Sequence, residues 1–212
     1  MEPFITAADL EAFMGGATID PDLEALALDA ACQMVRDYLE QTVNLVRDDI
    51  ELHDGTGREG LLLKELPVIE VTLVEEDGVA LVVEDDYVVW PGGGILWRNG
   101  GQTIPSQWSK GRQNVEVIYD HGWAVSEGDV VETSEGIEVD RVPSSIRLAA
   151  LEAAARIVRA PSLAAVASGI TGETLGAYSY TASLGAVNAV IAGGLLPEER
   201  ITLDRYKPGG RS

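Results

Sequence analysis

The sequence contains few of the residues that form covalent cross-links and most catalytic sites. Among its 212 residues, Cys32 is the single cysteine, so no disulfide can form within the chain. The two histidines, His53 and His121, have no further ligands placed around them, and no metal site is expected. No run of about 18 apolar residues occurs, so no transmembrane helix is expected. The N-terminus lacks a basic, apolar leader, and synthesis in the cytosol is expected.

Basic residues are also scarce, and their scarcity is uneven. The chain carries 35 acidic and 15 basic residues, a formal net charge of −20. Residues 1–141 hold 30 of the acids and 8 of the bases, whereas residues 142–212 hold 5 acids and 7 bases. Such a surface repels DNA phosphates, which argues against sequence-specific DNA binding. It is typical either of a protein kept soluble by its charge or of a wall past which DNA moves without adhering.

Two helices are predicted near the N-terminus. Thr6 and Asp9 form a loose capping box that opens a short helix through Phe13. Asp20 and Pro21 then begin a helix that runs to about Thr42. Its predicted core face comprises Leu23, Leu26, Ala27, Ala30, Met34 and Tyr38, and its predicted polar face comprises Asp22, Asp29, Gln33, Arg36 and Glu40.

The middle of the chain is predicted to be an antiparallel β region. The expected strands are Ile50–His53, Leu61–Leu63, Val68–Glu75, Val79–Val83, Tyr87–Trp90, Ile95–Arg98 and Val115–Tyr119. Asp77-Gly78 is the strongest indication of a hairpin turn. Residues 124–141 are interpreted as an exposed acidic excursion, with Glu135-Gly136 as a candidate turn.

A second long helix is predicted from Pro143 to about Arg159, ended by Pro161. Its expected core stripe is Ile146, Ala150, Ala153 and Ile157, with Leu148 and Leu151 widening it. Glu152 and Arg156 have the spacing of an ion pair within one helix. A short helix opens at Pro197. The predicted fold is therefore α+β, with N-terminal helices (1–47), a β region (48–141), a long core helix (142–169) and an extended C-terminal segment (170–212).

No catalytic constellation is found. Gly55, Gly57 and Gly60 match a dinucleotide-binding fingerprint in spacing, but Pro67 follows too soon for the helix that must receive the phosphates, and a hairpin turn is the better interpretation. The carboxylates cluster at predicted turns. The four tryptophans all lie in the β region, where they serve as core and interface anchors or line a ligand platform; they are Trp90, Trp97, Trp108 and Trp123.

Three stretches resemble the head-tail connector (adaptor) family of tailed bacteriophages. The first is Phe4-Ile5-Thr6 with Asp9-Leu10 and the Ala-rich helix at Leu26–Leu39. The second runs from Asp54-Gly55 through Leu66-Pro67-Val68 to Val74. The third comprises Val142-Pro143, Ile146 and the helix that follows, then Glu173, Gly176, Tyr178-Ser179, and Leu203-Asp204-Arg205-Tyr206. Their order and spacing cover most of the chain, except the acidic excursion.

The resemblance implies a structural protein of the virion with neither enzymatic activity nor a cofactor. It also implies a helical core, with an antiparallel β part in larger members. Members form a ring, usually of twelve copies, beneath the portal, extend the DNA channel and dock the next neck protein. The C-terminal segment is implied to reach the portal, with Tyr178, Tyr180, Leu203 and Tyr206 as candidate anchors. Asp22, Asp29, Glu40, Glu127 and Asp129 are candidate channel-facing acids.

Two alternatives remain open at this point. One is another ring of the same neck, a stopper or tail-completion protein. The other belongs to a different class, a carbohydrate-binding or hydrolytic protein that uses the tryptophan-rich β region.

Overall fold

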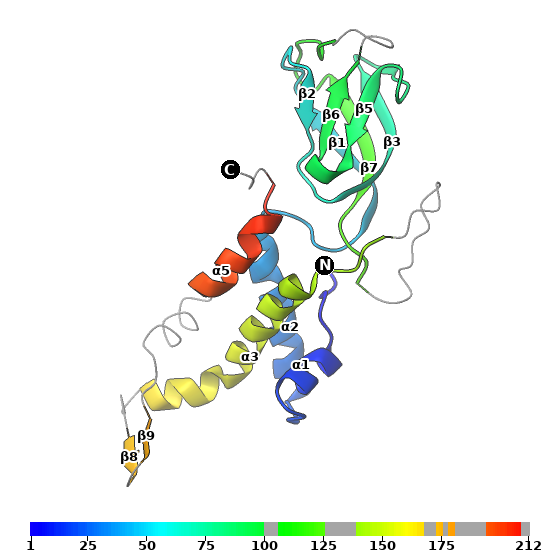
Figure 1. The fold of residues 1–212 in the computed structure, drawn as a ribbon. Helices are drawn as coiled ribbons and strands as arrows, with labels where there is room; N and C mark the ends of the chain where they lie inside the picture. Colours follow the sequence, from blue (N-terminus) through cyan, green and yellow to red (C-terminus); the bar gives the residue numbers. More distant parts are fainter. Residues whose placement is uncertain (100–105, 126–138, 168–172, 176–177, 181–193, 209–212) are drawn as a thin grey trace. The chain divides into compact units, whose positions relative to one another are not determined.

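A computed structural model describes residues 1–99, 106–125, 139–167, 173–175, 178–180 and 194–208. The chain folds into two compact units, and the second is inserted into the first (Figure 1). Residues 1–40 and 143–212 belong to the helical unit, and residues 41–142 form the β unit. The α+β class predicted from the sequence is confirmed, with antiparallel strand pairing in every sheet.

The helical unit begins with two capped helices. Before α1 (Ala7–Phe13), the Thr6 hydroxyl accepts a hydrogen bond from the Asp9 amide at 3.1 Å, and the Asp9 carboxylate accepts one from the Thr6 amide at 3.0 Å. This is the predicted capping box. Before α2 (Pro21–Leu39), the Asp20 carboxylate accepts from the amides of Asp22 and Leu23. The helix ends where Glu40 takes a left-handed conformation, two residues before the predicted end.

The buried face of α2 differs from the predicted one. Its core residues are Ala27, Leu28, Ala31, Cys32, Val35 and Leu39. Leu26, predicted to be in the core, is 62 % exposed, whereas Arg36, predicted to be on the polar face, is buried. Arg36 donates to the Glu2 carbonyl at 2.6 Å and lies over the Phe4 ring. Leucines and alanines occupy more than one side of α2, so packing partners, and not periodicity alone, select the buried face.

Helix α3 (Ser144–Ala167) supplies much of the remaining helical core. Ile146, Ala149, Ala150, Ala153 and Ala154 are buried, which agrees with most of the predicted stripe, although Leu148 is 46 % exposed. The prediction that Pro161 ends the helix is wrong, because α3 continues to Ala167. Proline removes one backbone donor and crowds the preceding turn, and a helix can continue past it with a local distortion.

The C-terminal part of this unit contains short elements. Strands β8 (Glu173–Leu175) and β9 (Tyr178–Tyr180) pair as an antiparallel ribbon. Helix α5 (Pro197–Leu203) begins at the predicted proline and leads into the 3₁₀ turn η2 (Asp204–Tyr206).

The β unit contains two sheets whose strands agree closely with prediction. The first has the order β1-β7-β3-β4, from β1 (Val46–His53), β3 (Val68–Glu76), β4 (Val79–Ala80) and β7 (Val115–His121). The second has the order β2-β6-β5, from β2 (Gly60–Leu62), β5 (Tyr87–Trp90) and β6 (Ile95–Arg98). A 3₁₀ turn, η1 (Pro91–Gly93), joins β5 to β6.

One core joins the inner faces of the two sheets. Leu61, Leu63, Tyr87 and Leu96 beside the three-stranded sheet share a cluster with Val74, Val115, Val117 and Tyr119 of the larger one. Trp108 completes this cluster and is fully buried. Successive side chains of a strand point to opposite faces, so the strand residues between these core residues point away from the core.

Two turns in the β unit were predicted with different success. Asp77 and Gly78 both have positive φ and join β3 to β4, as expected for a two-residue hairpin. Residues 54–57 do not form a hairpin, because β1 and β2 belong to different sheets. They form a crossing loop held by the Asn114 side chain, which accepts from the Gly55 amide at 2.8 Å, and by the Trp108 carbonyl, which accepts from the Gly57 amide at 3.0 Å. Gly60 then begins a strand and not a helix, so the context of a dinucleotide loop is missing.

Candidate functional site

Helix α5 is fixed to the helical unit by a buried ion pair with α3. Arg156 donates two hydrogen bonds to the Glu199 carboxylate, one of them at 3.0 Å, and the Glu199 side chain is 2 % exposed. The same carboxylate accepts from the Leu196 amide at 2.7 Å, at the start of α5. Burial, with the nearby Glu199 charge, raises the pKa of Glu152, and Arg156 opposes this rise. Arg156 therefore pairs with Glu199 in addition to lying near its predicted partner Glu152.

Tyr38 on α2 makes a second connection to the C-terminal turn. Its hydroxyl donates to Asp204 at 2.5 Å, and this hydrogen bond raises the pKa of Tyr38. The Lys207 ammonium lies 3.8 Å from the centre of the Tyr38 ring, and the Arg200 guanidinium lies 5.7 Å from it. Such cation–π contacts hold basic side chains at an aromatic face. The last described turn is thus bound to the long N-terminal helix.

The predicted docking residues have different environments. The Leu203 side chain is fully buried in its own unit. Tyr206 is half-buried, and its hydroxyl lies 2.7 Å from the Ser145 hydroxyl. Tyr178 and Tyr180 lie on β9, and their side chains fall outside the described residues. A docking role for this segment stays a prediction. The structure adds Ile201, which is 73 % exposed on α5 and which the sequence had not suggested.

The predicted channel-facing acids on α2 share one exposed stripe. Asp22, Asp29 and Glu40 are all exposed, and Asp37 lies among them, accepting a hydrogen bond from the Gln33 side chain at 2.7 Å. Leu26 and Gln33 lie between these acids, and the stripe as a whole still repels a polyanion. Glu127 and Asp129 lie outside the described residues, as does the candidate turn at Glu135-Gly136. Whether the stripe faces a channel stays a prediction.

A buried polar cluster lies in the core of the β unit. Glu51 on β1 accepts from the Tyr119 hydroxyl at 2.7 Å, and its other carboxylate oxygen lies 3.1 Å from His53 Nε2 and 3.1 Å from Lys64 Nζ. Burial alone would raise the pKa of Glu51, but hydrogen bonds from His53 and Tyr119, and from the Lys64 amide, lower it to about 2. Burial and the hydrogen bond to Glu51 raise the pKa of Tyr119. The Glu51 side chain is 8 % exposed, so the cluster joins strands instead of meeting a substrate.

Both histidines lie at strand ends, each with its Nε2 atom beside a carboxylate. His53 ends β1 beside Glu51, and His121 ends β7 with its Nε2 atom 3.2 Å from the Asp49 carboxylate. Among the described residues, no group of three or more His, Cys, Asp and Glu side chains is placed to hold a metal ion.

Across the same parts of the chain, no helix has the length and apolar character needed to span a membrane.

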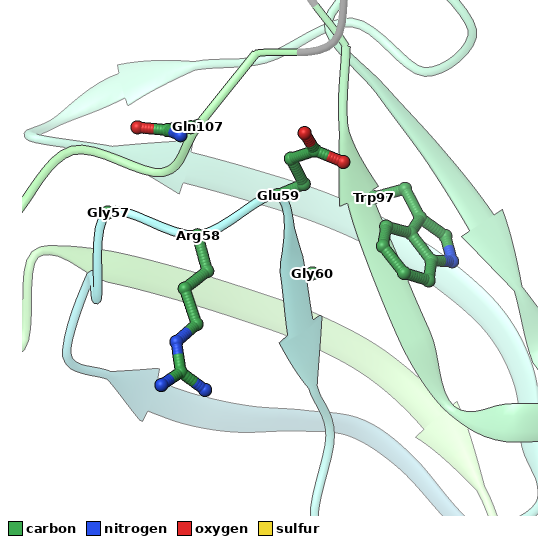
Figure 2. A pocket seen from close by; sticks show the side chains of 6 residues that line it. All are labelled: Gly57, Arg58, Glu59, Gly60, Trp97 and Gln107. Carbon is green, nitrogen blue, oxygen red and sulfur yellow. The ribbon is translucent and has the colours of Figure 1, made fainter.

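The four tryptophans divide into two groups. Trp108 and Trp123 are buried, whereas Trp90 and Trp97 are 53 % and 42 % exposed. A hollow of about 460 Å³ lies beside Trp97 and is lined by Gly57, Arg58, Glu59, Gly60 and Gln107 (Figure 2). Figure 2 shows Arg58 and Trp97 on either side of the start of β2. The hollow is open to solvent, and Arg58, Glu59, Trp97 and Gln107 beside it are exposed, whereas small-molecule sites are usually enclosed and mostly apolar.

Three of the solved structures to which this chain is similar come from gene transfer agent particles. One comes from the virion of a native gene transfer agent (GTA) particle; it is 12 % identical, has a TM-score of 0.47, and the match covers 91 % of this chain and 90 % of the other. The second comes from the neck of an empty GTA particle computed with C6 symmetry, at 14 % identity, TM-score 0.47, and coverage of 96 % and 88 %. The third comes from the neck of a native GTA particle computed with C12 symmetry, at 14 % identity, TM-score 0.43, and coverage of 96 % and 92 %.

No protein-family model matches the chain, and no curated protein matches it. Identities and TM-scores as low as those of the three structures identify no shared function.

Proposed function

We propose that this chain is a structural protein of a phage-like virion that forms a ring at the junction of head and tail. In the finer form of the proposal it is the adaptor: it lies beneath the portal, extends the DNA channel and docks the next neck protein. It is made in the cytoplasm of the host bacterium and has no catalytic role.

One observation carries this proposal. The two outer stretches that resemble the connector family, at the N-terminus and from Val142 onward, belong to a single helical unit, although about a hundred residues separate them. These stretches are joined by an ion pair between Asp9 and Arg147 at 2.8 Å and by the hydrogen bond from Tyr38 to Asp204. The intervening β unit is a separate insertion. A helical core with an inserted antiparallel β part is the organisation that the resemblance implies.

The charge distribution supports a role beside DNA without binding to it. The exposed side of α2 is an acidic stripe, and the whole chain has 20 more acidic than basic residues. Screening acts over about 8 Å at physiological ionic strength, so the repulsion between the stripe and DNA is short-ranged and prevents adhesion without opposing passage.

The proposal is tested by mass photometry of the purified chain mixed with the portal ring encoded in the same genome. Twelve chains of 22.6 kDa should add about 270 kDa to the portal in one step. A complex that forms only with an assembled tail component, and not with the portal, would favour the stopper or tail-completion role. A chain that binds neither would contradict the neck function.

A further inference from the structure

Both outer faces of the β unit carry apolar side chains that solvent contacts. On the larger sheet, Ile50, Ile118 and Leu73 are aligned across β1, β7 and β3, and Leu52 lies in the next row. We name these four residues the isoleucine face; Ile50 is 59 % exposed and Leu52 is 44 % exposed. An antiparallel sheet that covers a core on one side usually presents polar residues on the other.

The smaller sheet presents a second apolar surface. Its outward residues form two rows, Leu62–Ile95–Trp90 and Gly60–Trp97–Val88. We name Leu62, Val88, Trp90, Ile95 and Trp97 the tryptophan face; Leu62 is 51 % exposed. Exposed aromatic and aliphatic residues gathered in this way mark protein interaction sites.

The two faces lie on opposite sides of one unit. The inner residues of both sheets meet in a common core, so their outer faces point away from each other. A molecule with two different adhesive faces on opposite sides associates head to tail, and repetition of the contact closes a ring where the rotation permits.

Charges at the edges of the two faces are complementary. Glu116 and Glu75 lie in the same row as Leu52, beside the isoleucine face. Arg58 borders the hollow next to Trp97 on the tryptophan face; Glu59 lines the same hollow, and Figure 2 shows the two side chains leaving the chain in opposite directions. In a chain this acidic, two like surfaces repel each other, and an exposed arginine is the group that can meet two glutamates of another copy.

We propose that the tryptophan face of one copy docks on the isoleucine face of the next, with Arg58 opposite Glu75 and Glu116. The β unit then makes the contact between neighbouring copies. Closure of this contact into a ring rests on the proposed neck function, whereas the contact itself does not.

Cross-linking between two full-length variants tests the contact without the portal. One variant carries Ile50→Cys, the other carries Trp97→Cys, and a short bismaleimide joins cysteines that lie close together. The native Cys32 is fully buried, and the wild-type chain checks that it does not react. A mixture of the two variants should give a mixed dimer, identified by mass, while each variant alone should give almost none.

A matched control and a charge reversal complete the design. Arg112 is exposed in the same unit but lies in neither face, so a mixture of Arg112→Cys with Trp97→Cys should give no dimer above background. Arg58→Glu in the Trp97→Cys chain should reduce the yield of mixed dimer about tenfold, and Glu116→Arg in the Ile50→Cys chain should restore it. Thermal unfolding of each variant confirms that it is folded.

The outcomes separate this contact from the proposed function. If the mixture of Ile50→Cys and Trp97→Cys gives no more mixed dimer than the Arg112→Cys control mixture, the proposed contact is overturned, even if a ring forms on the portal. If Ile50→Cys alone gives as much cross-linked dimer as the mixture does, the proposal is also overturned, because two isoleucine faces would then be in contact. A specific mixed dimer without any binding to the portal supports the contact and contradicts the neck function.

Discussion

At the scale of single residues, the buried Arg156–Glu199 pair is one of the contacts that hold the C-terminal helix to the helical unit. We expect Glu199→Gln to lower the free energy of unfolding of the helical unit by about 3 kcal/mol, because it leaves the Arg156 charge buried without its partner. Urea denaturation followed by helical circular dichroism measures this loss. Glu198→Gln, one position away and exposed, is the matched control and should change stability by less than about 0.5 kcal/mol. Equal effects of the two substitutions would contradict the structural role of the pair.

The pKa of Glu51 predicts how the β unit responds to acid. Its folded value of about 2 lies below the ordinary 4.5, so its stabilising contribution is complete above about pH 4.5 and is lost as the pH falls towards 2. The loss should be about 3 kcal/mol at most. All four tryptophans lie in this unit, and urea titrations read by tryptophan fluorescence report it directly.

A hydrogen-bond variant provides the control for this acid response. Tyr119→Phe removes one of the donors that lower the pKa of Glu51, so stability should decline less between pH 4.5 and 2. The same decline in both proteins would show that other carboxylates are responsible.

At the scale of elements, two glycines of the β unit predict different sensitivities to the same substitution. A Cβ atom at Gly55 would lie 1.8 Å from the Ser109 carbonyl oxygen, which is backbone and cannot move aside cheaply. Gly78 has a positive φ but open space around it. We expect Gly78→Ala to cost about 1 kcal/mol and Gly55→Ala to cost several times more. Thermal unfolding read by fluorescence measures both, and similar losses would show that the crossing loop can move away from residue 55.

How well each element could be predicted depends on where its determinants lie. The strands were predictable because β-branched residues alternate and turn residues such as Asp77-Gly78 separate them. The buried face of α2 was not, because leucines and alanines occupy more than one side of the helix and its packing partners, mainly α3, decide which are covered. The continuation of α3 past Pro161 likewise overrides a local rule.

The candidate sites show the same limit. Arg156 and Glu199 are 43 positions apart, so sequence spacing suggested Glu152 as the partner instead. The two apolar outer faces were also missed, because exposure of a strand residue depends on which sheet covers its other side. By contrast, the acidic stripe on α2 was predictable, since its members are spaced along one helix.

At the scale of the whole molecule, two separate cores predict two unfolding transitions. Fluorescence reports the β unit, because it holds every tryptophan, and circular dichroism at helical wavelengths reports the helical unit. We expect the two urea curves to have different midpoints, since a single cooperative transition requires that all probes coincide. Glu199→Gln should shift the helical curve and leave the fluorescence curve in place. Coincident curves that shift together would contradict independent units.

The two ends of the inserted β unit lie close together, which bears on how a protein of this kind evolves. Asn44 pairs with Trp123 on one side of an extended segment, and Arg141 pairs with Ala124 on the other, so Asn44 and Arg141, near the two ends of the insertion, lie about 10 Å apart. A short loop spans that gap. A shorter gene that lacks residues 41–142 could therefore encode the same helical unit, and the whole β unit could be gained, lost or exchanged by recombination at a single seam, independently of the helices on either side.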